Sequence, residues 1–192
     1  RTGSSAITST VSKKRLMTGM TGKKALKKSS TEPGRRGDGA SRWRGVVVMA
    51  KTAVVTGASR GIGRAIALAL AEEGFDIAAV ALPDADRMAE LGHQVSATGR
   101  RFEAYQLDIA RVADHQAILD RIAGAFGRTD CLVNNAGVSV LRRGDLLDVT
   151  AESYDRCFDV NTRGTFFWTQ AVARRMAAAE ATPGAVRSIV FV

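Results

Sequence analysis

The sequence of 192 residues contains few of the residues that crosslink chains or bind metals. It has two cysteines, Cys131 and Cys157, and two histidines, His93 and His115, none with a partner at metal-ligand spacing. These counts exclude a disulfide framework and predict no metal site, so we expect both cysteines to be small apolar filler in a reducing, cytoplasmic compartment. The longest apolar run, residues 65–71, is far shorter than the roughly 20 residues of a membrane span, so we expect no membrane partner.

Acidic residues are scarce at the start of the chain, and this scarcity explains the overall charge of +9. Residues 1–49 contain 12 Lys and Arg and two acidic residues, which gives a net charge of +10. Residues 50–192 contain 16 Lys and Arg and 17 Asp and Glu, which gives a net charge of −1. A basic segment therefore precedes a nearly neutral body, and the charge of the whole chain describes neither part.

Residues 1–49 contain 13 Ser and Thr and 7 Gly, with no helical or strand periodicity. Such a segment buries too little apolar surface to offset its ordering entropy, so we expect a disordered tail. It has four interpretations: a nucleic-acid-binding arm, a transit peptide, a segment left over from expression or processing, or upstream sequence foreign to the natural protein. We favour the last two, because Met49 is a plausible start and Trp43 is the only aromatic residue there.

From Lys51 onward, short apolar runs alternate with segments of helical periodicity. The expected strands are residues 53–55, 75–82, 102–107, 131–133 and 188–192, and the expected helices are residues 62–74, 85–98, 112–126 and 151–179. Strands that alternate with helices of this length predict an α/β fold in which a doubly wound parallel sheet is covered on both faces. Residues 50–192 would form this domain.

A glycine-rich turn, Thr56-Gly57-Ala58-Ser59-Arg60-Gly61-Ile62-Gly63, joins the first expected strand to the first expected helix. Gly57 would permit the sharp turn, Gly61 would let the backbone approach a pyrophosphate, and Gly63 would allow close helix–strand packing. The helix N-terminus would present free N–H groups to the phosphates. Taken alone, this turn is equally typical of a tight strand–helix connection that binds nothing.

Three further motifs follow the glycine-rich turn in a fixed order. They are Leu107-Asp108-Ile109, Asn134-Asn135-Ala136-Gly137 and Asp159-Val160-Asn161. Together the four motifs resemble the short-chain dehydrogenase/reductase family over residues 51–192, nearest to its 3-oxoacyl-carrier-protein reductase branch. The resemblance implies a Rossmann-type sheet, here ending after its fifth strand. It also implies an enzyme that transfers hydride between a nicotinamide cofactor and a small carbonyl or alcohol substrate.

The family's roles can be placed on matching residues of this chain. The implied cofactor-binding residues are Gly57, Ser59, Arg60, Gly61, Ile62, Gly63, Asp108, Ile109, Asn135, Ala136 and Gly137. Asp108 would accept a hydrogen bond from the adenine amino group with Ile109 beside the ring, and residues 135–137 would lie under the ribose. Asn134 would tie strands together. Asp108 has a second interpretation, as a loop carboxylate that caps the next helix.

Asn161 is the one catalytic residue that the resemblance assigns within this chain. It falls on a stripe of the long expected helix with Tyr154, Phe158, Trp168 and Val172, which we expect to face inward. A polar amide on an inward face must find partners. Asn161 would therefore either hold a water in a proton relay, as the family implies, or be an ordinary hydrogen-bonded core asparagine.

The residues after the second expected strand favour NADP(H) over NAD(H). A carboxylate about 20 residues past the glycines would bind the ribose hydroxyls of NAD(H), and counting from the glycines nominates Asp84. Aligned on the strand end, however, that position holds Ala81 or Leu82, which would not repel a 2′-phosphate. Arg60 would offer that phosphate a cationic fork. NAD(H) remains the alternative cofactor.

The rest of the family's catalytic set is absent from the 192 residues. No Tyr-x-x-x-Lys occurs, Lys51 is the only lysine after residue 49, and the implied Ser, Tyr and Lys would follow Val192. We therefore expect an inactive N-terminal part of a reductase whose full-length form is a homo-oligomer. Two alternatives are a non-catalytic nucleotide-binding or regulatory module and, less favoured, a nucleic-acid-binding protein acting through the basic tail.

Overall fold

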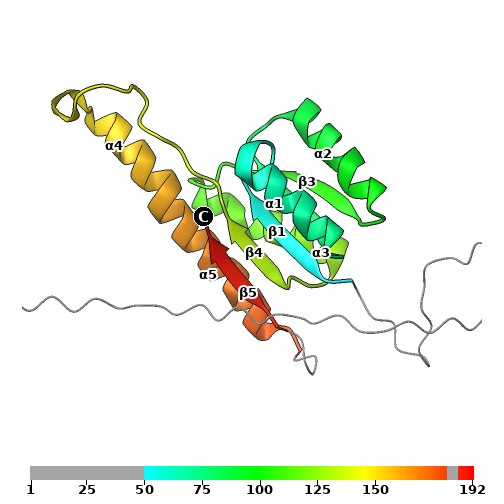
Figure 1. Ribbon diagram of the computed structural model, residues 1–192. Helices are drawn as coiled ribbons and strands as arrows, with labels where there is room; N and C mark the ends of the chain where they lie inside the picture. The colour runs from blue at the N-terminus through cyan, green and yellow to red at the C-terminus, as the bar shows by residue number, and fades with distance from the viewer. Residues whose placement is uncertain (1–49, 181–185) are drawn as a thin grey trace, which may run out of the picture. The chain divides into compact units, whose positions relative to one another are not determined.

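Five parallel strands form the centre of the domain (Figure 1). The computed structural model describes residues 50–180 and 186–192, so the expectations for residues 1–49 lie outside the described part. The strands are β1 (Thr52–Thr56), β2 (Asp76–Ala81), β3 (Phe102–Gln106), β4 (Cys131–Asn134) and β5 (Ser188–Phe191). Their order is β3-β2-β1-β4-β5, and every neighbouring pair is parallel. The order reverses between β1 and β4, which is the topological switch point where such sheets bind ligands.

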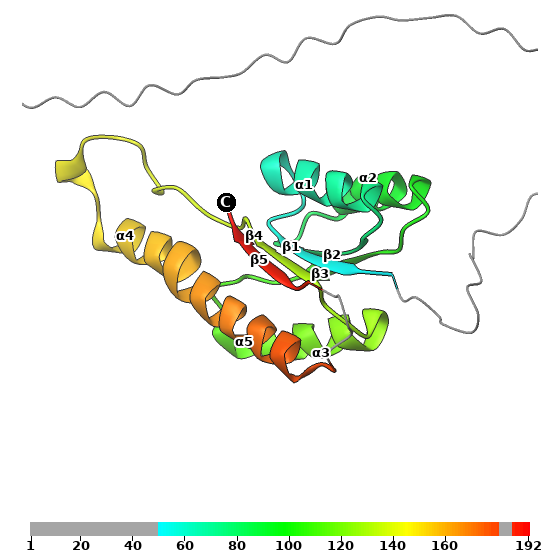
Figure 2. The same ribbon diagram turned by 60° about the horizontal axis from the view of Figure 1, so that its bottom comes forward.

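Helices cover both faces of this sheet. The α-helices are α1 (Gly61–Glu72), α2 (Ala85–Ala97), α3 (His115–Phe126), α4 (Ala151–Phe158) and α5 (Thr165–Ala178); the shorter turns are η1 (Val112–Asp114), η2 (Leu146–Asp148) and the π-helix η3 (Asp159–Gly164). Figure 2 shows α1 and α2 on one face and α3 and α5 on the other. The predicted Rossmann-type, doubly wound α/β fold is confirmed. None of the described helices is long and apolar enough to cross a membrane.

The alternation of side chains along the central strands builds two separate cores. Ala53 and Val55 of β1 pack with residues of α1 and α2, whereas Val54 packs with residues of α3 and α5. All residues of β1 and β2 are buried. A parallel sheet covered on both faces has no polar side, which is why its central strands read as continuous apolar runs in the sequence.

The prediction of one continuous α-helix over residues 151–179 is wrong in one respect, because the π-helix η3 separates α4 from α5. A π-turn closes its hydrogen bonds one residue later than an α-turn and so shifts the phase of the side chains that precede it. Trp168 and Val172 are buried as predicted. Tyr154 and Phe158 are about half exposed and stack on each other, with ring centroids 4.3 Å apart.

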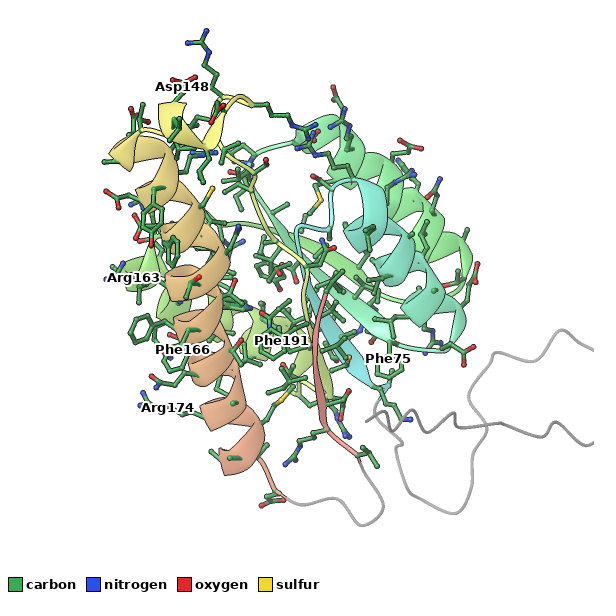
Figure 3. All side chains as sticks on the ribbon, turned by 60° about the vertical axis from the view of Figure 1, so that its left-hand side comes forward. Phe75, Asp148, Arg163, Phe166, Arg174 and Phe191 are labelled. Carbon is green, nitrogen blue, oxygen red and sulfur yellow. The ribbon has the colours of Figure 1, made fainter. Side chains whose placement is uncertain are left out.

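The strand β5 lies at one edge of the sheet and is exposed along its length. Its Phe191 is 63% exposed, and Phe166 of the neighbouring helix α5 is 59% exposed. Figure 3 shows the two side chains on these adjoining elements. They line a shared hollow of about 470 Å³.

Candidate nucleotide-binding site

The turn between β1 and α1 has the backbone geometry that only glycine adopts easily. Gly57 and Gly61 have positive φ values of 66° and 56°. Arg60 is the N-cap residue of α1 and makes no capping bond through its side chain. The first turn of α1 also carries no acidic side chain. The positive end of the α1 dipole is therefore available to an anion at this turn.

Gly63 lets the start of α1 pack against the ends of β1 and β4. A Cβ at this position would overlap both the carbonyl oxygen of Gly57 and Nδ2 of Asn135. The start of α1 therefore packs closely against the end of β1 at Gly63, as the sequence suggests. Gly63 lies behind the cavity described below rather than on its wall.

Thr56 and Asn135 hold the carboxyl ends of β1 and β4 together. Thr56 Oγ1 donates to the carbonyl of Val133 (3.3 Å) and accepts from the backbone N–H groups of Asn135 and Ala136 (3.0 Å each). Asn135 Nδ2 donates to the carbonyls of Thr56 (3.0 Å) and Gly57 (3.2 Å). Sequence reasoning gave Thr56 no role. The available signal was a polar residue at the end of a buried strand, directly before the turn.

Asn134 differs from its expected role of tying strands together. It is buried, and its Nδ2 donates to Thr169 Oγ1 at 2.9 Å, so its side chain joins β4 to α5. The side-chain link between the strands is made instead by Thr56 and Asn135. Two adjacent asparagines therefore point to opposite faces of the sheet, as alternation along a strand requires.

Asp108 lies just after β3 with its side chain exposed. Its Oδ1 accepts the backbone N–H of Ala110 at 3.0 Å, which stabilises the turn before η1. The bond closes the turn and does not cap a helix, because η1 begins at Val112 and has no side-chain capping bond. The neighbouring Ile109 is buried.

These segments surround a cavity of about 600 Å³ at the carboxyl ends of the strands. Except for Gly63, every residue that the sequence assigns to the cofactor lies on its wall. The wall also includes Val138 and Val160 and three arginines, Arg60, Arg87 and Arg156. The structure thus brings together motifs that are as far apart in the sequence as Gly57 and Gly137.

The end of β2 and the start of α2 contribute both neutral and charged residues to the cavity wall. Ala81 and Leu82 both line the cavity, as do Asp84 and Arg87. Asp84 Oδ2 lies 3.2 Å from Arg87 Nη1, so the carboxylate is already paired. Sequence reasoning missed Arg87, because nothing in its local pattern shows that the start of α2 faces the glycine-rich turn.

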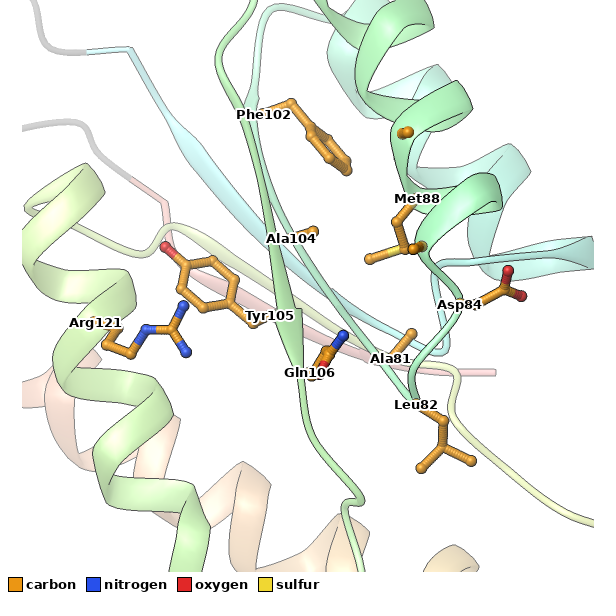
Figure 4. Close-up of a pocket in the computed structure, with 11 residues that line it drawn as sticks. Ala81, Leu82, Asp84, Met88, Phe102, Ala104, Tyr105, Gln106 and Arg121 are labelled. Atoms are coloured by element: carbon orange, nitrogen blue, oxygen red, sulfur yellow. The ribbon is translucent and has the colours of Figure 1, made fainter.

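A second, smaller cavity of about 380 Å³ adjoins the first at Leu82 and Asp84 and runs along β3. Figure 4 shows Phe102 and Met88 on one side of β3 and Tyr105 with Arg121 on the other. Burial, reinforced by the carboxylate of Glu103, raises the pKa of Tyr105 above its ordinary value. No residue of the four sequence motifs lies on its wall.

Asn161 lies outside the large cavity and lines the hollow shared by Phe166 and Phe191. Its side chain is exposed rather than inward-facing, because η3 changes the phase of the helix. Its Oδ1 accepts the N–H of Val138 and its Nδ2 donates to the carbonyl of Val138, both at 2.8 Å. The amide therefore fixes the segment after Gly137, which forms part of the cavity wall. Across residues 50–180 and 186–192, no three His, Cys, Asp or Glu side chains gather closely enough to hold a metal ion.

A family model described as "short chain dehydrogenase" matches residues 51–192. The chain belongs to this family. It is 38% identical over 128 residues to 2-dehydro-3-deoxy-D-gluconate 5-dehydrogenase of Escherichia coli (strain K12), which covers 67% of the chain and 49% of that relative. The chain spans about half the length of the curated relatives it matches.

Two solved structures show the same arrangement of strands and helices. One is a 3-oxoacyl-[acyl-carrier protein] reductase from Brucella melitensis in complex with NAD, with 42% identity and a TM-score of 0.69 over 74% of this chain and 55% of that chain. The other is a short chain dehydrogenase from Burkholderia cenocepacia in complex with NADP, with 43% identity and a TM-score of 0.61 over 66% and 51% of the two chains. The resemblance that the four motifs carry is confirmed.

Proposed function

We propose that residues 50–192 form the cofactor-binding part of an NAD(P)-dependent oxidoreductase acting on a small carbonyl or alcohol substrate. The observation that carries this proposal is the cavity at the switch point, whose wall combines the glycine-rich turn with residues 108–109 and 135–137. Membership of the short chain dehydrogenase family supports it. A nicotinamide cofactor supplies hydride to a carbonyl carbon, and this chain's own residues bind and orient that cofactor.

Each wall of the cavity would recognise a different part of the dinucleotide. The uncapped start of α1 faces the position of the pyrophosphate, where Gly61 leaves the backbone open. Asp108 and Ile109 would hold the adenine, and residues 135–137 would lie under a ribose. Asn161 would act on the nicotinamide side, through its two hydrogen bonds to Val138 or through a water.

NADP(H) is the proposed cofactor in preference to NAD(H). The similar structures include complexes with each dinucleotide, so likeness to them favours neither. The preference rests on the cavity wall, where Ala81 and Leu82 are neutral. Asp84 is paired with Arg87, which leaves Arg60 as the guanidinium that would approach a 2′-phosphate. A guanidinium binds such a phosphate with charge-assisted hydrogen bonds.

Titration of the chain with NADPH and NADH tests this preference. We expect NADPH to bind more tightly, and Arg60→Ala to weaken NADPH by about 10-fold or more while changing NADH little, since it removes bonds to a charged group. Arg64→Ala is the matched control, because Arg64 pairs with Glu90 and does not line the cavity. Equal or tighter binding of NADH would reject the preference.

The 192 residues contain no Tyr-x-x-x-Lys, so we propose that this chain binds its cofactor without turning over a substrate. In the short-chain dehydrogenase/reductase family that motif supplies the proton to the reduced carbonyl. Mixing the chain with NADPH and a 3-oxoacyl thioester should leave the absorbance of NADPH unchanged. Oxidation of NADPH at an enzyme-like rate would contradict the proposal.

A further inference from the structure

The backbone carbonyl of Ile109 is a junction between the cavity wall and α3. Ile109 follows β3, is 5% exposed and lines the cavity beside Asp108. His115, the first residue of α3, is 3% exposed, and its Nε2 lies 2.8 Å from the Ile109 oxygen. Because a carbonyl can only accept, Nε2 must carry the proton and donate it. Burial also lowers the pKa of His115 below its ordinary value, which keeps the ring neutral with an unprotonated Nδ1.

The π-helix η3 packs closely against the same carbonyl. A Cβ at Gly164 would overlap the Ile109 oxygen and lie 2.8 Å from the Ile109 carbonyl carbon. Glycine is therefore the one residue that lets η3 approach this closely. The Ile109 carbonyl therefore meets both the imidazole of His115 and the backbone of Gly164.

Through η3 this junction reaches the opposite wall of the cavity. Val160 of η3 lines the cavity directly. Asn161, its neighbour, is bonded through both amide atoms to Val138, which also lines the cavity. The segments after β3 and after β4 are thus both fastened to the same six-residue π-helix.

We propose that His115 is a positioning residue of the nucleotide site. By donating to the Ile109 carbonyl, it holds the Asp108–Ile109 wall against η3, so that nucleotide binding is coupled to the conformation of the segment that carries Asn161. This inference rests on the proposed nucleotide-binding function. His115 touches neither the cavity nor a reacting atom and acts only through Ile109.

Trp168 provides a spectroscopic report on this junction. It is completely buried and lies one helical turn beyond Gly164, with its ring edge-to-face on His115 at a centroid distance of 5.2 Å and an interplanar angle of 85°. The only other tryptophan in the chain is Trp43. A Trp43→Phe background therefore leaves Trp168 as the sole source of tryptophan emission.

The test titrates this background with 5′-ADP, which carries only the adenine half of the dinucleotide. His115→Leu removes the donor and keeps an apolar side chain, whereas His115→Gln keeps an amide donor of similar reach. We expect ADP to change the emission of Trp168 when His115 is present. His115→Leu should weaken ADP binding about 10-fold, the cost of leaving a buried carbonyl unpaired, and should abolish this change in emission. His115→Gln should stay within about 3-fold of the unaltered chain and keep the signal.

The outcomes separate this inference from the function on which it rests. Failure of the unaltered chain to bind ADP would reject the proposed function. ADP binding that His115→Leu leaves unchanged, or an equal loss in both His115 variants, would overturn the positioning role alone. Amide hydrogen exchange on the unaltered chain avoids any folding defect of a variant. ADP should protect residues 108–115 and 159–164 together, and protection confined to residues 108–115 would contradict the coupling.

Discussion

At the scale of single residues, the site is built by short polar side chains that bond to the backbone. Thr56 and Asn135 make five hydrogen bonds to main-chain groups across the switch point. Such bonds matter most when they are lost, because a buried N–H or carbonyl left unpaired carries its full desolvation penalty. Two side chains therefore fix the shape of the turn that would hold a pyrophosphate.

Thr56→Val should lower the free energy of unfolding by about 1–3 kcal/mol, because it leaves the N–H groups of Asn135 and Ala136 without their acceptor. Thr52→Val in the same strand is the matched control. Thr52 is buried, and its hydroxyl has no hydrogen-bond partner in the described part of the chain, so its replacement should cost little. Urea denaturation measures both variants. Equal losses would contradict the role assigned to Thr56.

His115 should make the stability of the fold depend on pH. Its folded pKa lies below the ordinary value of 6.5 because of burial, so the unfolded chain binds more protons at moderately acidic pH. The stabilisation is complete above pH 6.5 and is lost as the pH falls from there through the folded pKa. His115→Gln should flatten this part of the profile. Denaturation midpoints at several pH values measure the difference, and parallel profiles would contradict it.

At the scale of elements, close packing of backbone on backbone positions α1 and η3. Gly63 brings α1 onto the turn after β1, and Gly164 brings η3 onto Ile109. Glycine is needed at both positions because any side chain would overlap the neighbouring atoms. A Cβ at either glycine would overlap a backbone carbonyl oxygen, that of Gly57 or of Ile109, which cannot move aside as the end of a flexible side chain can.

Gly63→Ala should destabilise the fold by about 1–3 kcal/mol, the usual cost of overpacking, and should weaken nucleotide binding by tilting α1. Gly124→Ala is a matched control in α3, where an added Cβ meets nothing within 4 Å. That change should stabilise the protein by about 0.5–1 kcal/mol, because alanine favours a helix interior over glycine. Thermal unfolding of the two variants should therefore shift in opposite directions, and shifts in the same direction would contradict the packing argument.

The elements that sequence predicted well are those whose signal is local. Both the buried strands and α1 to α3 follow from apolar periodicity and from the glycines that end them. The interruption at η3 could not be predicted, because no local pattern marks it. The close approach of Gly164 to Ile109 that accompanies it joins residues far apart in the sequence. The exposure of Tyr154 and Phe158 follows from the same interruption.

The residues of the candidate site likewise divide into those with a local sequence signal and those without one. The glycine-rich turn and the segment after β4 were predicted from their residues and their resemblance, and the structure places them on one cavity wall. Thr56, Arg87 and His115 were missed. Each acts through a neighbour brought close by the fold, and no spacing in the sequence indicates that neighbour.

At the scale of the whole molecule, the described domain exposes a large apolar surface along one side. Phe166 and Phe191, labelled in Figure 3, line one hollow between α5 and β5. Phe158, the last residue of α4, is also exposed. The edge strand β5 also offers backbone groups for pairing. Exposed apolar surface next to a free strand edge favours association.

We expect the chain to self-associate at micromolar concentrations. Replacing Phe166 and Phe191 together by serine should shift sedimentation toward the monomer, since it removes apolar surface from one shared hollow. Leu147→Ser is the control, because Leu147 is 90% exposed but lies on η2, away from that hollow. A cooperative melt of a monomeric unaltered chain would contradict the expectation.

Calorimetric titration with NADPH tests the central claim, that residues 50–192 form a dinucleotide site, most directly. The matched variants are Gly61→Glu and Gly99→Glu, since both glycines have positive φ and open space around them but only Gly61 lines the cavity. We expect saturable binding with a dissociation constant below about 1 mM, the usual upper range for such ligands. Gly61→Glu should abolish binding by placing a carboxylate at the proposed phosphate position, while Gly99→Glu should retain it. Absence of saturable binding, or equal binding by both variants, would contradict it.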